Sequence, residues 1–267
     1  MRVPLSVRHA LSLPIRQISV PILAGPNRGR KWSIAASGQG IAKGHYEHER
    51  FVAFAALIQP DDVLWDLGAN HGYASLVAAA TITPTSGEVH AFEPSEYNRW
   101  YLRRHLRWND ADHVQIQPFA IADYVGTSTF GGTGSSAGFA LGKGAEQVQV
   151  STLTRMVAGG LRAPTFLKVD IEGAETLLLK GASDFLGPAA ASGTLPLILM
   201  SVHSPSHYRD CENVLRSFGY RVAASHRLDV STRHGETWDG DPDLLAIAPG
   251  RDVSAALRLP WFAQGQV

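Results

Sequence analysis

The sequence predicts an α/β fold built on a mostly parallel sheet. Short apolar runs alternate with amphipathic runs along the chain, which is the pattern of βαβ units. Residues 63–68 and 88–93 are two such apolar runs, and helical runs follow them at residues 73–81 and 95–108. Carboxylates come directly after these apolar runs. We therefore expect acidic side chains to gather at the edge of the sheet where parallel strands end.

The rest of the chain predicts further elements of both kinds. Strands are predicted at residues 114–122, 165–171, 195–202, 221–226 and 244–248. A helix is predicted at residues 208–218. The last two strands are too close in sequence for a helix between them, so a hairpin would place one antiparallel strand in the sheet. Residues 126–144 are rich in glycine, serine and threonine, which favours a mobile loop or substrate lid, and the polar residues 233–242 also predict a loop.

Length, charge and cysteine content restrict the class of protein. The chain has 267 residues, enough for one large domain, and its Lys+Arg and Asp+Glu totals are both 24, whereas nucleic-acid binders are usually strongly basic. One cysteine, Cys211, forms no intramolecular disulfide, and no apolar run approaches the ~20 residues that a membrane span needs. We therefore expect a cytoplasmic protein that acts on a small molecule, as a monomer or homo-oligomer, without a transmembrane segment or a nucleic-acid partner.

Charge is unevenly distributed at the N-terminus. Basic residues precede the first acid, Glu47, at Arg2, Arg8, Arg16, Arg28, Arg30, Lys31 and Lys43. We interpret residues 1–43 as a basic extension packed on the domain edge, with contact to a membrane surface or an acidic partner as the alternative. Residues 44–250 then form the main domain, and residues 251–267 form a C-terminal tail.

The loop after the first of these strands indicates a nucleoside ligand without phosphates. It reads Gly68-Ala69-Asn70-His71-Gly72. A dinucleotide pyrophosphate requires G-x-G-x-x-G at this turn. Asn70 and Tyr73 occupy the second and third glycine positions, which disfavours a nicotinamide- or flavin-dependent oxidoreductase. Asp66, just before the loop, can accept hydrogen bonds from an ammonium group or from loop amides.

Two further acids end the next predicted strands. Glu93 is placed to accept hydrogen bonds from both hydroxyls of a ribose, because an ionised carboxylate is an acceptor only. The alternative is that Glu93 caps the helix that starts near Ser95. Asp123 is the natural partner of an adenine amino group, although an Asp that merely opens a turn would look the same.

The predicted strand at residues 165–171 ends in charged residues that could take part in catalysis. Period-two alternation puts Lys168 and Asp170 on one side of the strand, and Glu172 lies in the next turn. His203 ends the following strand, so it can approach Asp170 and take up a proton at neutral pH. A Lys168–Asp170 ion pair is the structural alternative. No full set of metal ligands is evident, so no metal site is predicted, although a divalent ion on Asp170 oxygens is left open.

These motifs, in their order and spacing, resemble the FkbM family of S-adenosylmethionine-dependent methyltransferases. The matching pieces are residues 66–72, 92–94, 168–175 and 44–47. The resemblance covers residues 44–225. It implies a class I methyltransferase fold, which is Rossmann-like, with a seven-stranded and mostly parallel sheet, a reversed last strand and helices on both faces.

The resemblance also implies roles for individual positions. It places Asp66, Gly68, Asn70 and Gly72 around the methionine part of S-adenosylmethionine, Glu93 on the ribose, Asp123 near the adenine and Glu47 over the pocket, and it adds Ala69 and Phe92 to the cofactor-binding residues. The candidate catalytic residues are His203, Asp170 and Glu172, one of which would remove a proton from the methyl acceptor.

The predicted reaction is methylation of a hydroxyl or carboxyl oxygen on a small molecule, for example a natural product or a sugar. Methylation at nitrogen is one alternative, and a cofactor-binding but catalytically silent partner protein is another. The silent alternative depends on two departures from the family pattern. Ser201 stands where the family often has an acid, and Thr154 stands where it often has Asp. Both positions are expected on the substrate side.

Overall fold

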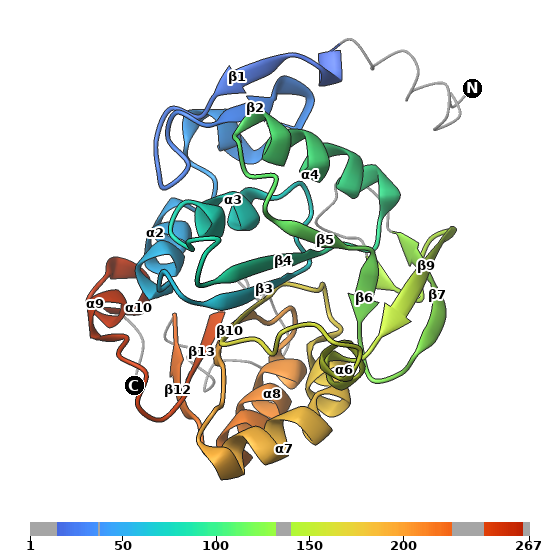
Figure 1. Ribbon diagram of the computed structural model, residues 1–267, viewed down its shortest axis with the longest axis vertical. Coiled ribbons are helices and arrows are strands. Elements are labelled where there is room, and N and C mark those ends of the chain that lie inside the picture. Colours follow the sequence, from blue (N-terminus) through green and yellow to red (C-terminus); the bar gives the residue numbers. More distant parts are fainter. Residues whose placement is uncertain (1–14, 37, 132–139, 226–242, 264–267) are drawn as a thin grey trace.

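A seven-stranded sheet forms the centre of the computed structural model of this chain, which describes residues 15–36, 38–131, 140–225 and 243–263 (Figure 1). In spatial order its strands are β12 (Arg221–Ala224), β13 (Asp243–Ile247), β11 (Leu197–Ser201), β10 (Phe166–Val169), β3 (Val63–Leu67), β4 (Glu88–Phe92) and β5 (Gln115–Gln117). β13 runs antiparallel to β11 and β12, and the other neighbours pair in parallel. The predicted sheet with a reversed last strand is confirmed.

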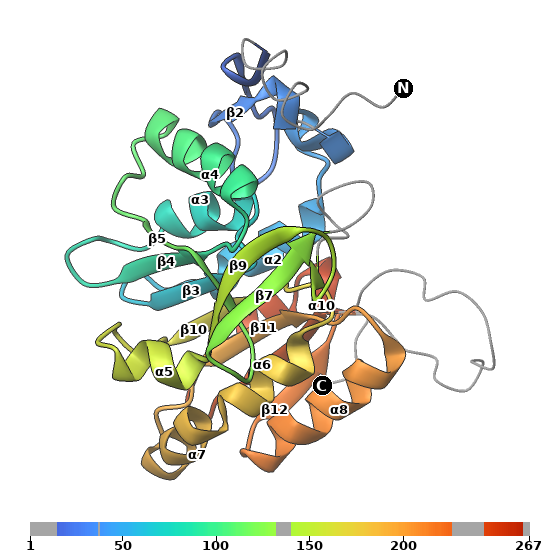
Figure 2. The same cartoon turned by 90° about the vertical axis from the view of Figure 1, so that its right-hand side faces the viewer.

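Helices cover both faces of this sheet, as Figure 2 shows for α3 and α4 on one side and α5 to α8 on the other. The first face carries α2 (His48–Leu57), α3 (Tyr73–Ala79), α4 (Glu96–Trp108), α9 (Ser254–Leu257) and α10 (Pro260–Ala263). The second carries α5 (Leu153–Ala158), α6 (Glu175–Gly181), α7 (Ser183–Ser192) and α8 (Pro205–Ser217). In β3, Leu64 packs toward the first face while Trp65 and Leu67 pack toward the second. Burial on both faces explains its continuous apolar run.

The described residues before residue 44 pack on α3 and α4. They contain β1 (Ser19–Pro21) and β2 (Lys31–Ser33), which pair antiparallel, and two 3-10 helices, η1 (Ile34–Ala36) and η2 (Gly38–Lys43). Trp32 is 1% exposed and stacks on His105 of α4, with ring centroids 3.7 Å apart. The basic extension therefore contributes to the core, and the domain boundary at residue 43 stays a prediction.

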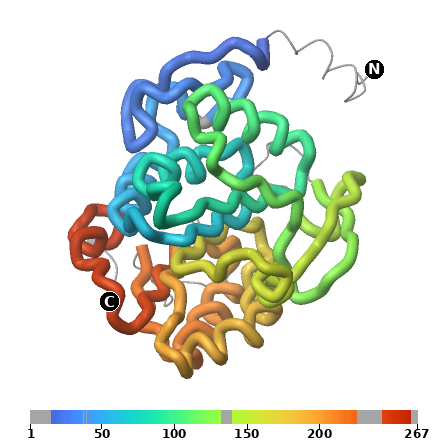
Figure 3. Tube along the Cα trace, in the orientation of Figure 1, coloured from blue at the N-terminus to red at the C-terminus, as the bar shows by residue number. Residues whose placement is uncertain are grey.

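Helices α9 and α10 near the C-terminus pack on α2, as the red part of the tube in Figure 3 shows. Arg251 pairs with Asp62 at 2.7 Å between Nη2 and Oδ2. In the described part of the chain, no helix is long and apolar enough to cross a membrane.

Two predictions for the middle of the chain are wrong. The single strand predicted at residues 114–122 is divided at Pro118, which lacks a backbone N–H, into β5 and β6 (Phe119–Ile121). The loop predicted at residues 126–144 contains β7 (Gly126–Gly131) and β8 (Ala140–Leu141). β7 pairs with β9 (Glu146–Ser151) and β8, so that a second sheet has the order β6-β9-β7-β8. Pairing of β7 with β9, 16 to 24 positions further along the chain, overrides local composition here.

One further prediction is wrong in where a helix begins, and two others concern residues that the structure does not describe. Helix α8 begins at Pro205 rather than at the predicted residue 208, because the Ser204 hydroxyl accepts a hydrogen bond from the His207 amide and proline suits the first helical turn. The loop predicted at residues 233–242 and the central part of the predicted lid, residues 132–139, lie outside the residues that the structure describes.

Gly181 provides a test of how closely α6 approaches the second sheet. A Cβ at this position would lie 2.1 Å from the carbonyl oxygen of Ala122. We expect Gly181→Ala to lower the free energy of unfolding by about 1–3 kcal/mol, the usual cost of overpacking, in urea denaturation. Gly187→Ala in α7 is the matched control, because its Cβ would meet no heavy atom within 4 Å. Similar stabilities for the two variants would contradict this constraint.

Candidate active site

A cavity of about 590 Å³ lies at the C-terminal ends of β3, β4, β10 and β11. Its volume is in the usual range for a small-molecule site, and its place in the sheet is the one where open α/β folds bind ligands. Residues predicted from the sequence that line it are Glu47, Gly68, Ala69, Asn70, Phe92, Glu93, Asp170, Glu172 and His203. The structure thus brings the predicted cofactor loop and the predicted catalytic residues into one cavity.

The loop after β3 requires glycine at its first position. Gly68 has φ +80°, and a Cβ there would lie 1.9 Å from the carbonyl oxygen of Asp170. Asn70 also adopts a left-handed conformation, with φ 50°. Its side-chain Oδ1 is buried and has no hydrogen-bond partner among the described residues. A buried acceptor without a partner is costly unless a ligand supplies the donor.

Glu93 lies at the end of β4 with only 3% exposure. Its Oε1 accepts hydrogen bonds from the Ser95 amide at 2.8 Å and from Asn98 Nδ2 at 3.2 Å, while Oε2 accepts one from the Asn70 amide at 2.8 Å. Burial raises the pKa of Glu93 to about 7 despite these hydrogen bonds. Glu93 therefore has local hydrogen bonds near the start of α4, and the same carboxylate also lines the cavity, so the ribose and capping interpretations both stay predictions.

Arg50 of α2 joins several elements beneath the cavity, although the sequence did not single it out. Its Nε lies 3.0 Å from Asp243 Oδ2 and its Nη1 lies 3.3 Å from Asp170 Oδ2. The same guanidinium donates to Glu47 and to the Ser201 hydroxyl. The side chain is 8% exposed, so these partners replace water around its charge.

Lys168 of β10 forms a second buried ion-pair group. Its Nζ lies 3.1 Å from Asp66 Oδ1 and 3.6 Å from Asp170 Oδ2. Lys168 and Asp66 are direct partners in the register of β10 and β3, and Ser75 donates to the other Asp66 oxygen at 2.7 Å. The Lys168–Asp170 ion pair considered as an alternative is confirmed.

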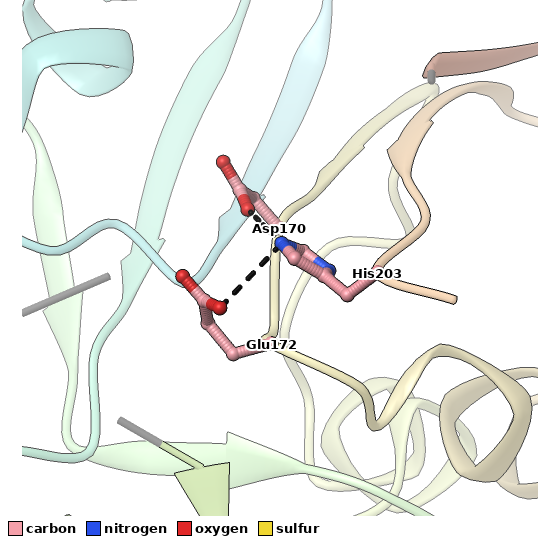
Figure 4. Close-up of side chains that lie close together, drawn as sticks. All are labelled: Asp170, Glu172 and His203. Atoms are coloured by element: carbon pink, nitrogen blue, oxygen red, sulfur yellow. Dashed lines mark ion pairs between the residues drawn. The ribbon is translucent and has the colours of Figure 1, made fainter. Parts of the chain in front are cut away.

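His203 meets three carboxylates at the rim of β10 and β11. Its Nε2 lies 3.4 Å from Asp170 Oδ1 and 3.6 Å from Glu172 Oε2, as the dashed lines in Figure 4 show. Its Nδ1 lies 2.6 Å from Oε1 of Glu175, which is fully buried. The predicted approach of His203 to Asp170 is confirmed. The role of Glu175 was missed, because the dipole of α6 alone accounts for an acid at that position.

The protonation of His203 differs from the sequence-based expectation. Burial would lower its pKa, but interaction with the carboxylates of Asp170 and Glu175 outweighs burial and raises the pKa of His203 to about 11. In this arrangement the imidazole already holds its proton at neutral pH. A neutral-pH base role for His203 therefore needs a change in its surroundings.

Three predicted cofactor-binding residues do not line the cavity. Asp66 is 0% exposed and lies beneath it, where it pairs with Lys168. At Gly72 a Cβ would meet Leu102 at 2.5 Å, so this glycine makes room for α4. Asp123 pairs with Lys180, with 2.7 Å between Oδ2 and Nζ. The geometry gives no support to direct cofactor contacts from these residues.

Aromatic side chains from distant parts of the chain complete the cavity wall. They are Trp32, Tyr46, Phe51, Tyr73 and Trp261. Trp261 also donates from Nε1 to Asp243 Oδ2 at 2.9 Å, which connects the C-terminal segment to the Arg50 group. Phe130 of β7 and Leu141 of β8 line the same cavity. Tyr46 belongs to the piece at residues 44–47 that resembles the family, and Tyr73 follows the Gly68 loop, but no sequence motif marks the other positions.

The fold and the cavity together define the class I methyltransferase architecture. A model of the methyltransferase FkbM domain matches residues 66–222, more than half of the chain. The chain therefore belongs to the FkbM methyltransferase family, which confirms the resemblance found in the sequence. No curated protein matches the chain.

The chain is similar to solved structures of methyltransferases at low sequence identity. Methyltransferase FkbM from Methylobacillus flagellatus KT is 19% identical to this chain, with a TM-score of 0.51. The match covers 77% of this chain and 52% of that protein, so this chain spans about half the length of that protein. An O-methyltransferase from Bacillus cereus in complex with SAH is 12% identical, with a TM-score of 0.47 and coverages of 76% and 80%. A precorrin-6y C5,15-methyltransferase from Geobacter metallireducens GS-15 is 14% identical, with a TM-score of 0.46 and coverages of 76% and 88%.

The Arg50 group predicts a large effect on stability. Arg50→Met would leave the buried Asp243 without its cation, and we expect the free energy of unfolding to fall by about 3–5 kcal/mol. Arg216→Met is the control, because Arg216 pairs with Glu212 on the exposed surface of α8 and its loss should cost less than about 1 kcal/mol. Urea denaturation of both variants measures the difference. Equal losses would show that the buried pairs do not stabilise the fold.

Proposed function

We propose that this chain is an S-adenosylmethionine-dependent methyltransferase that methylates an oxygen of a small molecule. Membership of the FkbM family supplies the class of reaction. The observation that carries the proposal is that one cavity contains both the Gly68–Glu93 side and the Asp170–Glu172–His203 side. A methyl donor and an acceptor would thus lie in the same enclosure, held in line for transfer.

The residues on the first side fit S-adenosylmethionine. Asn70 Oδ1, a buried acceptor without a partner among the described residues, would accept from the ammonium group of the methionine part. Glu93 Oε2 accepts a hydrogen bond from the Asn70 amide and has a further lone pair for a ribose hydroxyl. When bound, the cofactor supplies an activated methyl group. The predicted roles of Gly68, Ala69 and Phe92 around it remain part of this proposal.

The residues on the second side would orient the acceptor and remove its proton. Asp170, Glu172 and His203 lie together there, and we propose that a carboxylate of this group accepts the proton of the acceptor hydroxyl as the new bond forms, while His203 takes this role only where its surroundings change enough to release its own proton. Tyr46 and Trp261 enclose the same space and exclude water from it. A small hydroxylated molecule is the class of acceptor that this arrangement favours.

Two measurements test the reaction itself. The chain is incubated with S-adenosylmethionine and a panel of hydroxyl, carboxyl and amine compounds, and a mass gain of one methyl group at oxygen is expected. Methylation at nitrogen alone would contradict the proposed acceptor, and cofactor binding without transfer to any compound would favour the silent partner. S-adenosylhomocysteine, but not nicotinamide cofactors, should raise the melting temperature, because a ligand stabilises the fold that binds it.

Single substitutions should separate the two sides of the cavity. We expect Glu93→Gln to weaken S-adenosylhomocysteine binding by roughly tenfold to a hundredfold, the usual range for a lost hydrogen bond to a charged acceptor. His203→Ala should change this affinity by less than about twofold, since a residue on the acceptor side contributes little to cofactor affinity, but it should depress methyl transfer. Isothermal titration calorimetry measures both affinities, and circular dichroism verifies folding. If both variants lose S-adenosylhomocysteine affinity equally, the assignment of Glu93 to the cofactor side and His203 to the acceptor side is wrong.

Cofactor affinity should also depend on pH through Glu93. Since the pKa of Glu93 is raised to about 7, its carboxylate is largely protonated at pH 6 and largely ionised at pH 8. A ribose hydroxyl donates to the ionised form, so S-adenosylhomocysteine should bind up to about tenfold more weakly at the lower pH. Calorimetry at several pH values measures this slope. The pH dependence of the affinity should be lost in Glu93→Gln. If it persists in this variant, a titratable group other than Glu93 causes it.

A further inference from the structure

We infer that Asp170, Glu172 and His203 form a binding site for one divalent metal ion on the acceptor side of the cavity. Asp170 follows β10, Glu172 lies in the turn before α6, and His203 follows β11. Figure 4 shows the three side chains converging, with one His203 nitrogen toward both carboxylates. One ligand atom of each residue lies within 4.8 Å of the other two. The sequence alone predicted no metal site, because these residues are contiguous only in the fold.

The distances match ligands around a common ion better than direct hydrogen bonds. His203 Nε2 lies 3.4 Å from Asp170 Oδ1 and 3.6 Å from Glu172 Oε2. A direct N–H···O bond has a length of about 2.7–3.2 Å. Two ligands that each bind one ion at about 2.1 Å, at a tetrahedral angle, lie about 3.4 Å apart. The space between Nε2 and the two oxygens therefore has the dimensions of a metal site.

Glu175 provides the support that metal-binding histidines usually have. Its Oε1 lies 2.6 Å from His203 Nδ1, and the same oxygen accepts from the Gly173 amide at 2.9 Å. With Nδ1–H donating to this buried carboxylate, the ring is held with Nε2 toward Asp170 and Glu172. A carboxylate behind a histidine in this way orients the ring and raises its basicity toward the metal.

The charge of the surroundings also favours a cation. The carboxylates of the connected ion-pair groups are Glu47, Asp66, Asp170, Glu172, Glu175 and Asp243. They outnumber the cations that pair with them among the described residues, Arg50, Lys168 and protonated His203, whose proton on Nε2 the metal ion would replace. The two carboxylate oxygens of Asp170 have different neighbours. Oδ2 faces the cations Arg50 and Lys168, whereas Oδ1 faces His203. One oxygen is thus available to the ion without loss of the ion pairs.

The donor set indicates the kind of metal. One imidazole nitrogen and two carboxylate oxygens suit Mn²⁺, Fe²⁺ or Zn²⁺, whereas Ca²⁺ and Mg²⁺ prefer oxygen ligands throughout. Three protein ligands leave coordination positions for another group. The ligand atoms line the cavity, so that group can come from a molecule bound there.

The consequence for catalysis rests on the proposed function. With the ion bound, the three side chains would act as its ligands and not as the proton acceptor: an acceptor hydroxyl on the ion would have a lowered pKa and release its proton to a water molecule. The oxygen's electron pair would then form the bond to the methyl carbon, while the sulfur keeps the electron pair of the broken bond to carbon and becomes a neutral thioether. The metal would take no part in electron transfer, so no oxidant or reductant is needed.

Manganese binding tests the site without any methyl acceptor. The full chain is freed of metal with a chelator, and Mn²⁺ is added while electron paramagnetic resonance measures the free ion. We expect one ion per chain, with at least tenfold weaker binding in Glu172→Gln and in His203→Gln. Glu88→Gln is the matched control, because Glu88 also faces a histidine, His90, but at a hydrogen-bond distance of 2.9 Å and outside the cavity lining. Its Mn²⁺ affinity should equal that of the unchanged chain.

Electron spin-echo modulation adds a readout that a structural role of His203 would not affect. Coupling to an imidazole nitrogen should be present with bound Mn²⁺ and absent in His203→Gln. Failure of the unchanged chain to bind Mn²⁺, or equal binding by all the variants, would overturn the site. S-adenosylhomocysteine affinity is measured on the same samples. If the chain binds S-adenosylhomocysteine but not Mn²⁺, the metal site is contradicted and the proposed function is not. If it binds Mn²⁺ but not S-adenosylhomocysteine, the metal site is supported and the proposed function is contradicted.

Discussion

The rest of the structure depends on the pairing of buried charges beneath α2. Arg50 and Lys168 have side-chain exposures of 8% and 6%, and between them they pair with Asp66, Asp170 and Asp243. Each such ion costs several kcal/mol to desolvate, and removal of one partner leaves the other uncompensated. The ends of β3, β10 and β13 must therefore keep their positions under α2. The ends of β3 and β10 line the cavity, and Asp243 at the start of β13 pairs with Arg50 beside it. The same contacts therefore maintain the stability of the fold and the geometry of the site.

A close approach of two backbones couples the sides of the cavity. The Gly68 turn, which carries the proposed cofactor side, leaves no room for a Cβ because the Asp170 carbonyl oxygen fills that space. Asp170 also directs its carboxylate toward His203 on the acceptor side. Lys168 Nζ lies 3.4 Å from the Gly68 carbonyl oxygen as well as facing Asp170. A displacement at the end of β10 would therefore move donor and acceptor groups together, which suits a reaction that needs both in line.

The strands that carry the site were predictable because they are buried on both faces. β3 and β10 read as apolar runs, so the carboxylates that follow them mark strand ends, and strand order alone places His203 beside Asp170. Arg50 was not predictable, since it meets Asp243 across 193 positions of the chain. The β7–β9 pairing was hidden for a different reason: its strands pair only 16 to 24 positions apart, but the composition of residues 126–144 favours a loop. Local signals thus identified the strand ends, but not the partners that enclose them.

The departure from the family pattern at Ser201 has a structural explanation that weighs against a silent partner protein. Ser201 pairs in register with Asp243 of the antiparallel β13, and its hydroxyl donates to Asp243 Oδ1 at 2.6 Å. Arg50 contacts both residues, so the carboxylate missing from β11 is supplied by the neighbouring strand. The second departure, Thr154, donates to the Gly181 carbonyl oxygen and does not line the cavity, contrary to the expectation of a substrate-side position. Thr154 thus lies outside the cavity, and at Ser201 the Arg50 guanidinium keeps a carboxylate partner in Asp243, so neither departure leaves a buried cation unpaired.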